Sequence, residues 1–231
     1  NKRQMLALYR LGYDYTTFRV PGFDLNTAYT AQRKEKTISL NEGSLIHNRA
    51  DFDAYDWADP DTADWDSVNR LAQDLPDGMK LIVYGPNGVL ENAIDLVGYE
   101  RLCLMLYDDP QLVHDIFEQV GSRLVRSYEL AARYECVGAC ISNDDWGFKT
   151  QTLLSTADLR RFVFPWHKRI VETVHAAGKP VILHSCGYFG KIMDDIADDI
   201  RFDGRHSYED TIMPVEKAYE QYHDRIAILR D

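Results

Sequence analysis

Hydrophobic residues follow two different spacings along this chain. Short apolar runs rich in β-branched and aromatic residues are bounded by Gly, Pro, Asn or Asp, a pattern typical of buried strands. Six segments are expected to be strands: "YDYTTFRV", "KLIVYGPNG", "CVGACIS", "PVILHSCG", "FDGRHS" and "RIAIL". Between them, apolar residues recur every three or four positions, as on the buried face of a helix. The clearest helix opens at Asp109 and Pro110, which supply an N-cap and a proline in the first helical position.

The order of these segments predicts an α/β fold. Strands separated by helices form parallel sheets through right-handed βαβ units, either as a doubly wound sheet or as a (β/α)8 barrel. Polar residues follow several consecutive predicted strands at their carboxyl ends, as they do in barrel active sites, which favours the barrel. Because only six strands are predicted, we expect residues 1–231 to form a single TIM-barrel domain that is incomplete at one or both ends.

Charge and cysteine content narrow the range of partners and compartments. The chain has 26 basic and 37 acidic residues, a formal charge of −11, which opposes nonspecific binding to nucleic acid or to anionic membranes. The apolar runs are too short to span a membrane. Four cysteines are sparse for this length and indicate reduced thiols. We therefore expect a cytoplasmic protein that binds neither nucleic acid nor membrane.

The strongest candidate for chemistry is a histidine and a cysteine at the end of the fourth predicted strand. His184 and Cys186 are two residues apart, so on a strand they share one face, about 6.5 Å apart along the axis. Gly187 relaxes the backbone there, so both side chains could converge on one ion. Zinc suits one imidazole and one thiolate, and a catalytic zinc site needs three protein ligands and an open position. The alternative is a half-buried histidine beside an inert cysteine.

Acidic residues follow the third and fifth predicted strands. Asp144 or Asp145 could accept a proton, bind a substrate amine or pyrrole NH, or hold a metal-bound water, and we take both as catalytic candidates. The alternative is a solvated turn. His206 and Glu209 could support a metal ligand or act as a general acid, and a hydrogen-bonded surface pair fits them equally well.

Other polar and aromatic residues are candidates for binding. Asn87 and Trp146 follow the second and third predicted strands and are expected to contact substrate, as is His206. The irregular segment 24–66 is expected to be a functional loop, whose tryptophans would cover a flat ligand or pack on the barrel: Trp57 and Trp65. The histidines in predicted helices are expected to face solvent: His167, His175 and His223.

Several ordered blocks of the chain resemble the uroporphyrinogen decarboxylase superfamily over roughly residues 80–231. The blocks are "GPNGVLENAIDLVGYERLCLMLYDDPQLV", "NDDWGFKTQTLLSTADLRRFVFPWHKRIVETVHAAGKPVILHSCG" and "DGRHSYEDTIMPVEKAYEQY". The resemblance implies a (β/α)8 barrel, in which the strands present here look like the second to the seventh.

The superfamily has two main branches, and the resemblance implies a different activity for each. Decarboxylases remove acetate carboxyls from a porphyrinogen without a cofactor and need several basic side chains, of which this chain offers only Arg205 and Lys149 at strand ends. Corrinoid-dependent methyltransferases hold zinc with an H-x-C pair and a distant cysteine. "HSC" matches that pair as His184 and Cys186, and the third ligand would lie beyond Asp231.

We therefore predict a zinc-dependent methyltransferase that moves a methyl group between a corrinoid protein and a thiol or similar acceptor. The first alternative is a cofactor-free uroporphyrinogen decarboxylase that acts on a tetrapyrrole. The second is a non-catalytic barrel that binds a tetrapyrrole or a partner. A homodimer is the oligomeric state that the decarboxylase branch suggests.

Overall fold

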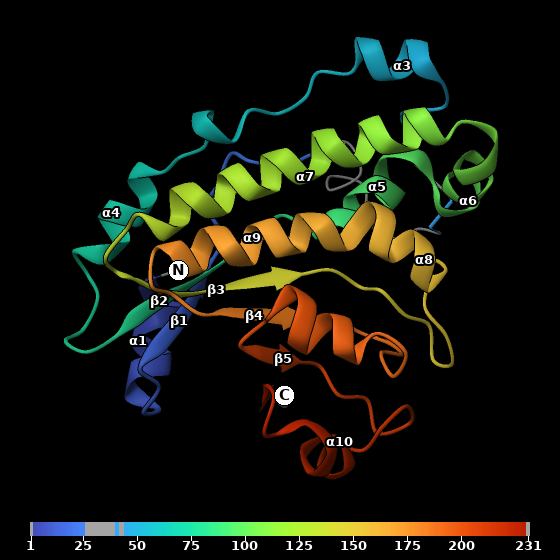
Figure 1. Cartoon of the computed structure of the whole chain (residues 1–231). Helices are drawn as coiled ribbons and strands as arrows, with labels where there is room; N and C mark the ends of the chain where they lie inside the picture. Colours follow the sequence, from blue (N-terminus) through green and yellow to red (C-terminus); the bar gives the residue numbers. More distant parts are fainter. Residues whose placement is uncertain (1, 26–39, 42–43, 230–231) are drawn as a thin grey trace.

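A computed structural model describes residues 2–25, 40–41 and 44–229 of the chain. Its centre is one sheet of six strands that lie side by side in sequence order, every neighbouring pair parallel (Figure 1). The strands are β1 (Tyr15–Phe18), β2 (Lys80–Tyr84), β3 (Val137–Asn143), β4 (Val181–His184), β5 (Gly204–His206) and β6 (Ala227–Leu229). The α/β prediction is confirmed, and the strand order is that of consecutive strands in a (β/α)8 barrel.

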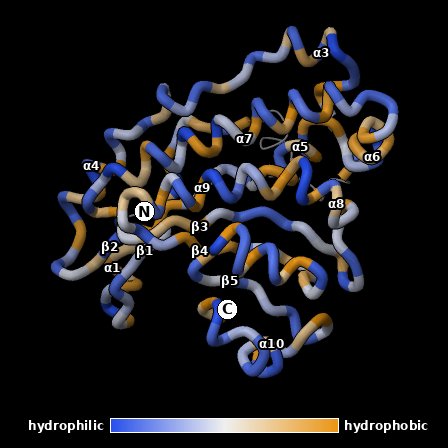
Figure 2. Tube along the Cα trace, in the orientation of Figure 1, coloured by the Kyte–Doolittle hydropathy of each residue, from blue (hydrophilic) through white to orange (hydrophobic). Residues whose placement is uncertain are grey.

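Helices connect the strands and cover one face of the sheet. Three of them pack most extensively on it or on each other: α5 (Val89–Val97), α7 (Pro110–Ala132) and α9 (Phe164–Ala176). The other elements are α1 (Lys2–Arg10), α3 (Arg49–Ala54), α4 (Asp66–Ala72), α6 (Tyr99–Asp108), α8 (Thr156–Asp158) and α10 (Val215–Tyr222), with short helical turns η1 (Pro60–Thr62), η2 (Leu159–Val163) and η3 (Asp195–Ile200). Hydrophobic and hydrophilic residues alternate along α7 and α9 (Figure 2), and their hydrophobic residues, such as Phe117 and Val171, are buried together with Leu81 of β2. The core therefore lies between the helices and the sheet.

Successive side chains of each strand point alternately into this core and toward the opposite, concave face of the sheet. In β2, Leu81 and Val83 are buried against the helices, whereas Ile82 and Tyr84 point the other way and line a pocket. The pairing register places Asn143, His184 and His206 side by side across β3, β4 and β5. Polar residues from three strand ends are therefore brought to the same level of the concave face.

Local sequence signals set the helix boundaries. Asp109 caps α7, because its carboxylate accepts a hydrogen bond from the Leu112 amide at 3.0 Å. Gly98, with φ of 87°, separates α5 from α6, because glycine adopts this backbone conformation without strain. Pro165 lies in the first turn of α9, which begins at Phe164 directly after the π-helical turn η2.

The tryptophans of the irregular segment pack against the protein. Trp65 stacks on Tyr134 with ring centroids 6.2 Å apart, and its indole NH donates to the Pro60 carbonyl. Trp57 packs edge-on against Tyr55. These side chains were expected either to cover a flat ligand or to pack on the barrel, and the contacts seen are packing contacts.

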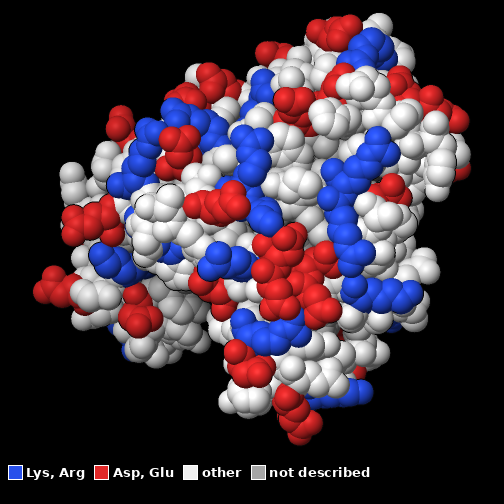
Figure 3. All heavy atoms as spheres, in the orientation of Figure 1, with Lys and Arg blue, Asp and Glu red and all other residues white. Residues whose placement is uncertain are grey.

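Surface charges are paired rather than segregated. Acidic and basic side chains are interspersed on the face drawn in Figure 3, with a group of acidic side chains low in the view. Aspartates of η3 and its neighbourhood form ion pairs with basic residues of other elements: Arg160–Asp195, Lys168–Asp199 and Arg225–Asp198. Among the helices of the described part of the chain, none combines the length and apolar character that a membrane span requires.

Gly121 lies where α7 and α9 approach most closely, and its replacement tests that packing. A Cβ at this position would meet the Trp166 ring at 2.0 Å, so Gly121→Ala should lower the free energy of unfolding by about 1–3 kcal/mol through overpacking. An exposed helical Gly→Ala change would instead raise it by up to about 1 kcal/mol. Denaturant unfolding measures the change, with the exposed Glu118→Ala on the same helix as control. A stabilised Gly121→Ala variant would contradict the packing described.

Candidate active site at the carboxyl ends of the strands

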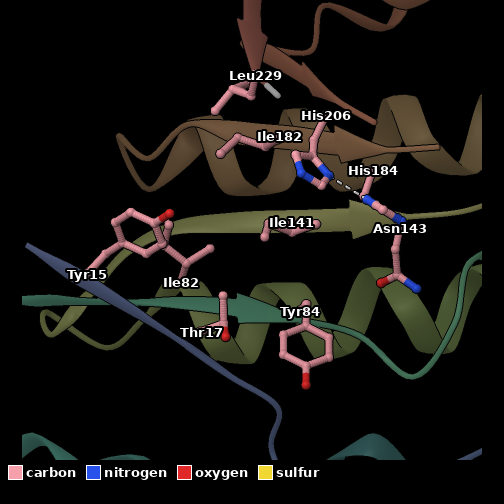
Figure 4. Close-up of a pocket in the computed structure, with 10 residues that line it drawn as sticks. All are labelled: Tyr15, Thr17, Ile82, Tyr84, Ile141, Asn143, Ile182, His184, His206 and Leu229. Atoms are coloured by element: carbon pink, nitrogen blue, oxygen red, sulfur yellow. Dashed lines mark hydrogen bonds between the residues drawn. The ribbon is translucent and has the colours of Figure 1, made fainter. Parts of the chain in front are cut away.

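The concave face of the sheet holds a pocket of about 520 Å³. Every strand contributes, through Tyr15, Thr17, Ile82, Tyr84, Ile141, Asn143, Ile182, His184, His206 and Leu229. Figure 4 shows these side chains pointing into the same space, with the two histidines and Asn143 gathered at one end. The pocket is therefore mostly apolar, and its polar groups come from the carboxyl ends of β3, β4 and β5.

The geometry of His184 and Cys186 suits a shared metal ion. The Nε2 atom of His184 lies 3.9 Å from the Sγ atom of Cys186, and both residues are half-buried. A tetrahedral zinc ion with Zn–N near 2.1 Å and Zn–S near 2.3 Å separates those two ligand atoms by about 3.6 Å. The strand ends at His184, so the backbone turns before Cys186 and brings the two side chains closer than an extended strand allows.

A hydrogen bond from the neighbouring strand orients the His184 ring. The Nδ1 atoms of His184 and His206 are 2.6 Å apart, so one ring carries a proton on Nδ1 and the other accepts it. If His184 is the donor, its Nε2 keeps a lone pair that faces Cys186, which is the tautomer that a metal ligand needs. The sequence places His206 and Glu209 together, but the structure pairs His206 with His184 instead.

The thiol of Cys186 is surrounded by polar and acidic groups. Burial raises its pKa above the ordinary value, and the charges of Asp145 and Glu209 raise it further, whereas a hydrogen bond with Ser207 opposes the shift. The Sγ atom lies 3.4 Å from the Ser207 Oγ. Glu209 is exposed and accepts a hydrogen bond from the Gly187 amide at 3.0 Å. Without a cation, this environment favours the neutral thiol.

Asp145 completes a cluster with the histidine and the cysteine. One ligand atom from each of Asp145, His184 and Cys186 lies within 4.8 Å of the others, and the Asp145 Oδ1 accepts a hydrogen bond from the Cys186 amide at 2.7 Å. Nitrogen, sulfur and oxygen donors together fit zinc. The other such group in the described residues is on the exposed side of α7, at His114, Asp115 and Glu118.

Asp144 does not face the pocket, which corrects its assignment as a catalytic candidate. Its carboxylate is fully buried and accepts hydrogen bonds from the Leu90 and Glu91 amides, both at 2.9 Å, at the N-terminus of α5. A helix N-terminus presents unpaired amides and the positive end of the helix dipole, so an aspartate is well accommodated there. Because neighbouring residues of an extended chain point to opposite sides, Asp144 faces the helices, whereas Asp145 reaches the Cys186 amide at the end of β4.

Two further side chains close the buried site of Asp144. The Trp146 Nε1 donates to its Oδ2 at 2.8 Å, and the His167 Nε2 lies 2.9 Å from the same atom. Both rings are fully buried, so Trp146 is not placed to contact substrate and His167 does not face solvent, contrary to expectation. The His167 Nδ1 is 3.0 Å from the Ser142 hydroxyl, which extends the network into β3.

Sequence reasoning also missed the role of Arg205 and Ser207. Arg205 is fully buried between the rings of Phe189 and Tyr208, and donates to the carbonyls of Ser185 and Ser207, both at 2.9 Å. It therefore ties together the ends of β4 and β5 and does not reach substrate carboxylates in the pocket. Ser207 has φ of 80°, a conformation that L-residues seldom adopt.

Asn87 and Glu91 lie at the start of α5. Asn87 has φ of 59° and donates to the buried Asp95 carboxylate at 2.8 Å. Burial, with the charges of Asp144 and Asp145, raises the pKa of Glu91 to about 8. Glu91 lines a small cavity together with Asp145, so it is the acidic neighbour that the sequence did not single out.

Comparison with known proteins agrees with this fold. The chain belongs to the uroporphyrinogen decarboxylase (URO-D) family, whose model matches residues 34–229. Two curated relatives called uroporphyrinogen decarboxylase, from Anaeromyxobacter sp. (strain Fw109-5) and Anaeromyxobacter dehalogenans (strain 2CP-C), are 32% and 31% identical over 126 and 152 residues. These matches cover 53% and 63% of the chain, and only 35% and 42% of the relatives.

A solved structure has the same fold. A methyltransferase from Methanosarcina mazei superposes with a TM-score of 0.69 over 99% of this chain and 68% of its own, at 15% identity. At that identity the likeness concerns the fold alone.

Two adjacent aspartates with different environments allow a matched test of the buried network. Asp144→Ala should lower the free energy of unfolding by about 3 kcal/mol or more, since it leaves buried donors of α5, Trp146 and His167 unpaired. Asp145→Ala should cost about 1 kcal/mol, because it loses one partly exposed hydrogen bond. Equal losses in denaturant unfolding would contradict the assigned orientations.

Proposed function

We propose that this protein is a zinc-dependent methyltransferase of the URO-D family, which moves a methyl group from a corrinoid protein to a thiol or similar acceptor. The observation that carries the proposal is the separation of 3.9 Å between His184 Nε2 and Cys186 Sγ at the polar end of the pocket. Structural packing alone does not require a histidine and a thiol to point their ligand atoms at the same space.

Zinc bound there would favour the thiolate form of the acceptor at neutral pH, and an open coordination position would receive it. The transfer forms a carbon–sulfur bond and breaks the carbon–cobalt bond, whose electron pair stays on the corrinoid. The acceptor proton leaves to solvent before this step. His206 fixes the orientation of the His184 ring, and the apolar lining from Ile82, Ile141 and Ile182 excludes water from the reacting atoms.

The surroundings of the pocket support methyl transfer over decarboxylation. Porphyrinogen carboxylates need basic partners, and the described residues that line the pocket include neither lysine nor arginine. Arg205, a basic residue of β5, is turned into the core. Asp144, a candidate for stabilising a protonated pyrrole, is likewise buried away from the pocket.

Decarboxylation of a porphyrinogen is the second candidate function. The observation that favours it is the name shared by the two Anaeromyxobacter relatives, which are more similar in sequence than the solved methyltransferase is. Those matches span less than half of each relative, so they leave most of a decarboxylase's length uncompared.

Metal content tests the metal site directly. Full-length protein should contain one zinc per chain by mass spectrometry, and His184→Ala and Cys186→Ser should each lose it because each removes a ligand. Cys103→Ser, which changes a half-buried thiol on α6, is the control and should keep the metal. Folded wild-type protein that takes up no zinc would contradict the proposal.

Activity distinguishes the two candidates. With methylcobalamin and 2-mercaptoethanol, the zinc-loaded full-length protein should form the methyl thioether, and Cys186→Ser should reduce the rate by about 100-fold or more. The same preparations are assayed with uroporphyrinogen for release of CO2. Decarboxylation that survives Cys186→Ser and metal removal would support the second candidate instead.

A further inference from the structure

We propose that Asn143 binds the methyl acceptor, and that this acceptor carries an uncharged hydrogen-bonding group, such as a hydroxyl or an amide, beside its thiol. This inference rests on the proposed function and adds to it a substrate class and the residue that selects it. Asn143 is the last residue of β3 and lines the pocket together with His184 and His206.

The first support is the position of Asn143 relative to the candidate metal ligand His184. The pairing register sets Asn143 beside His184, and His184 beside His206, at the carboxyl ends of three adjacent strands. Figure 4 shows these three side chains at the same end of the pocket. Adjacent strands lie about 5 Å apart, so the Asn143 side chain is within reach of a small molecule that is held next to His184.

The second support is an unused hydrogen-bond acceptor. The Oδ1 atom of Asn143 is shielded from solvent and has no hydrogen-bond partner in the described part of the chain. An unpaired amide oxygen in a mostly apolar environment costs free energy, and buried polar atoms of folded proteins are usually paired. Because the residue lines a pocket, we infer that its partner is a bound molecule. The terminal torsion of asparagine is soft, so a modest rotation turns the oxygen toward that molecule.

The third support is that the backbone of Asn143 is held on two sides. The Asp144 amide donates to the His184 carbonyl at 2.9 Å, which ties the end of β3 to β4. A Cβ on Gly88 would lie 2.2 Å from the Asn143 carbonyl oxygen, so the N-cap of α5 packs directly against this peptide. A side chain that is presented from such a fixed backbone binds a ligand at a lower cost in ordering.

The lining of the pocket indicates the charge of the ligand. The described residues that line it include no lysine, arginine, aspartate or glutamate. An ionised group on the acceptor would leave water there without a counter-ion, which is costly. Isoleucines of three adjacent strands instead offer an apolar surface for carbon atoms: Ile82, Ile141 and Ile182. A thiol with a neutral polar group therefore fits this pocket better than a thiol with a carboxylate or a sulfonate.

Two small thiols that differ in one hydroxyl test the assignment. 2-Mercaptoethanol has the hydroxyl and ethanethiol lacks it, and the dissociation constants of both are measured by calorimetry on zinc-loaded full-length protein without corrinoid. The preference for 2-mercaptoethanol over ethanethiol should fall by about three- to tenfold in Asn143→Leu, which is the effect of one hydrogen bond. Comparing the two proteins in this way cancels the intrinsic difference between the thiols. The same ratio of preferences is measured from kcat/KM for methyl transfer from methylcobalamin.

Two controls separate ligand binding from a structural role. Asn69→Leu, on the exposed side of α4, should keep the wild-type preference. Because the Asn143 oxygen is unpaired, Asn143→Leu should not lower the free energy of unfolding, whereas loss of a structural hydrogen bond would.

The outcomes distinguish this inference from the proposed function. Methyl transfer with a preference that changes less than threefold in Asn143→Leu would overturn the role of Asn143 and leave the transfer in place. Wild-type protein that binds neither thiol and transfers no methyl group would overturn the proposed function, and this inference with it.

Discussion

The burial of the Asp144 carboxylate against the N-terminus of α5 is the constraint on which the site depends. Its hydrogen bonds to the Leu90 and Glu91 amides fix the end of β3 to the layer of helices. Trp146 and His167 complete the network from the following loop and from α9. With Asp144 held on the helix side, Asp145 points the other way and accepts a hydrogen bond from the Cys186 amide beyond the end of β4.

The end of β5 supports the site without contributing either of its candidate metal ligands, His184 and Cys186. Arg205 holds the carbonyls of Ser185 and Ser207, and His206 fixes the ring of His184. Buried positive charge is costly, so an arginine buried where it ties two carbonyls together indicates that the relative position of these strand ends matters. Such an arrangement gives rigid support to the strand ends that carry the candidate ligands His184 and Cys186, as precise catalytic geometry requires.

The α/β fold could be predicted from the sequence because it depends on local periodicity. Buried strands at "KLIVYGPNG" and "PVILHSCG" and the cap at Asp109 indicate their structures without any tertiary information. The helical spacing of Phe164, His167 and Ile170 could also have placed His167 on the buried stripe of α9.

The remaining assignments depend on contacts between distant segments. Which of Asp144 and Asp145 faces the pocket is set by where β3 ends and by a helix that begins more than fifty residues earlier. The burial of Arg205 requires Phe189 and Tyr208 from two different loops, and the burial of Trp146 requires Phe164 and His167. None of these pairings leaves a regular spacing in the sequence.

The most direct test of the account is a crystal structure of the full-length protein with anomalous diffraction measured at the zinc absorption edge. The account predicts one anomalous peak per chain, bonded to His184 Nε2 and Cys186 Sγ, with Zn–N and Zn–S distances of about 2.1 Å and 2.3 Å. A peak confined to His114, Asp115 and Glu118 on α7, or no peak in a crystal grown with zinc, would contradict it.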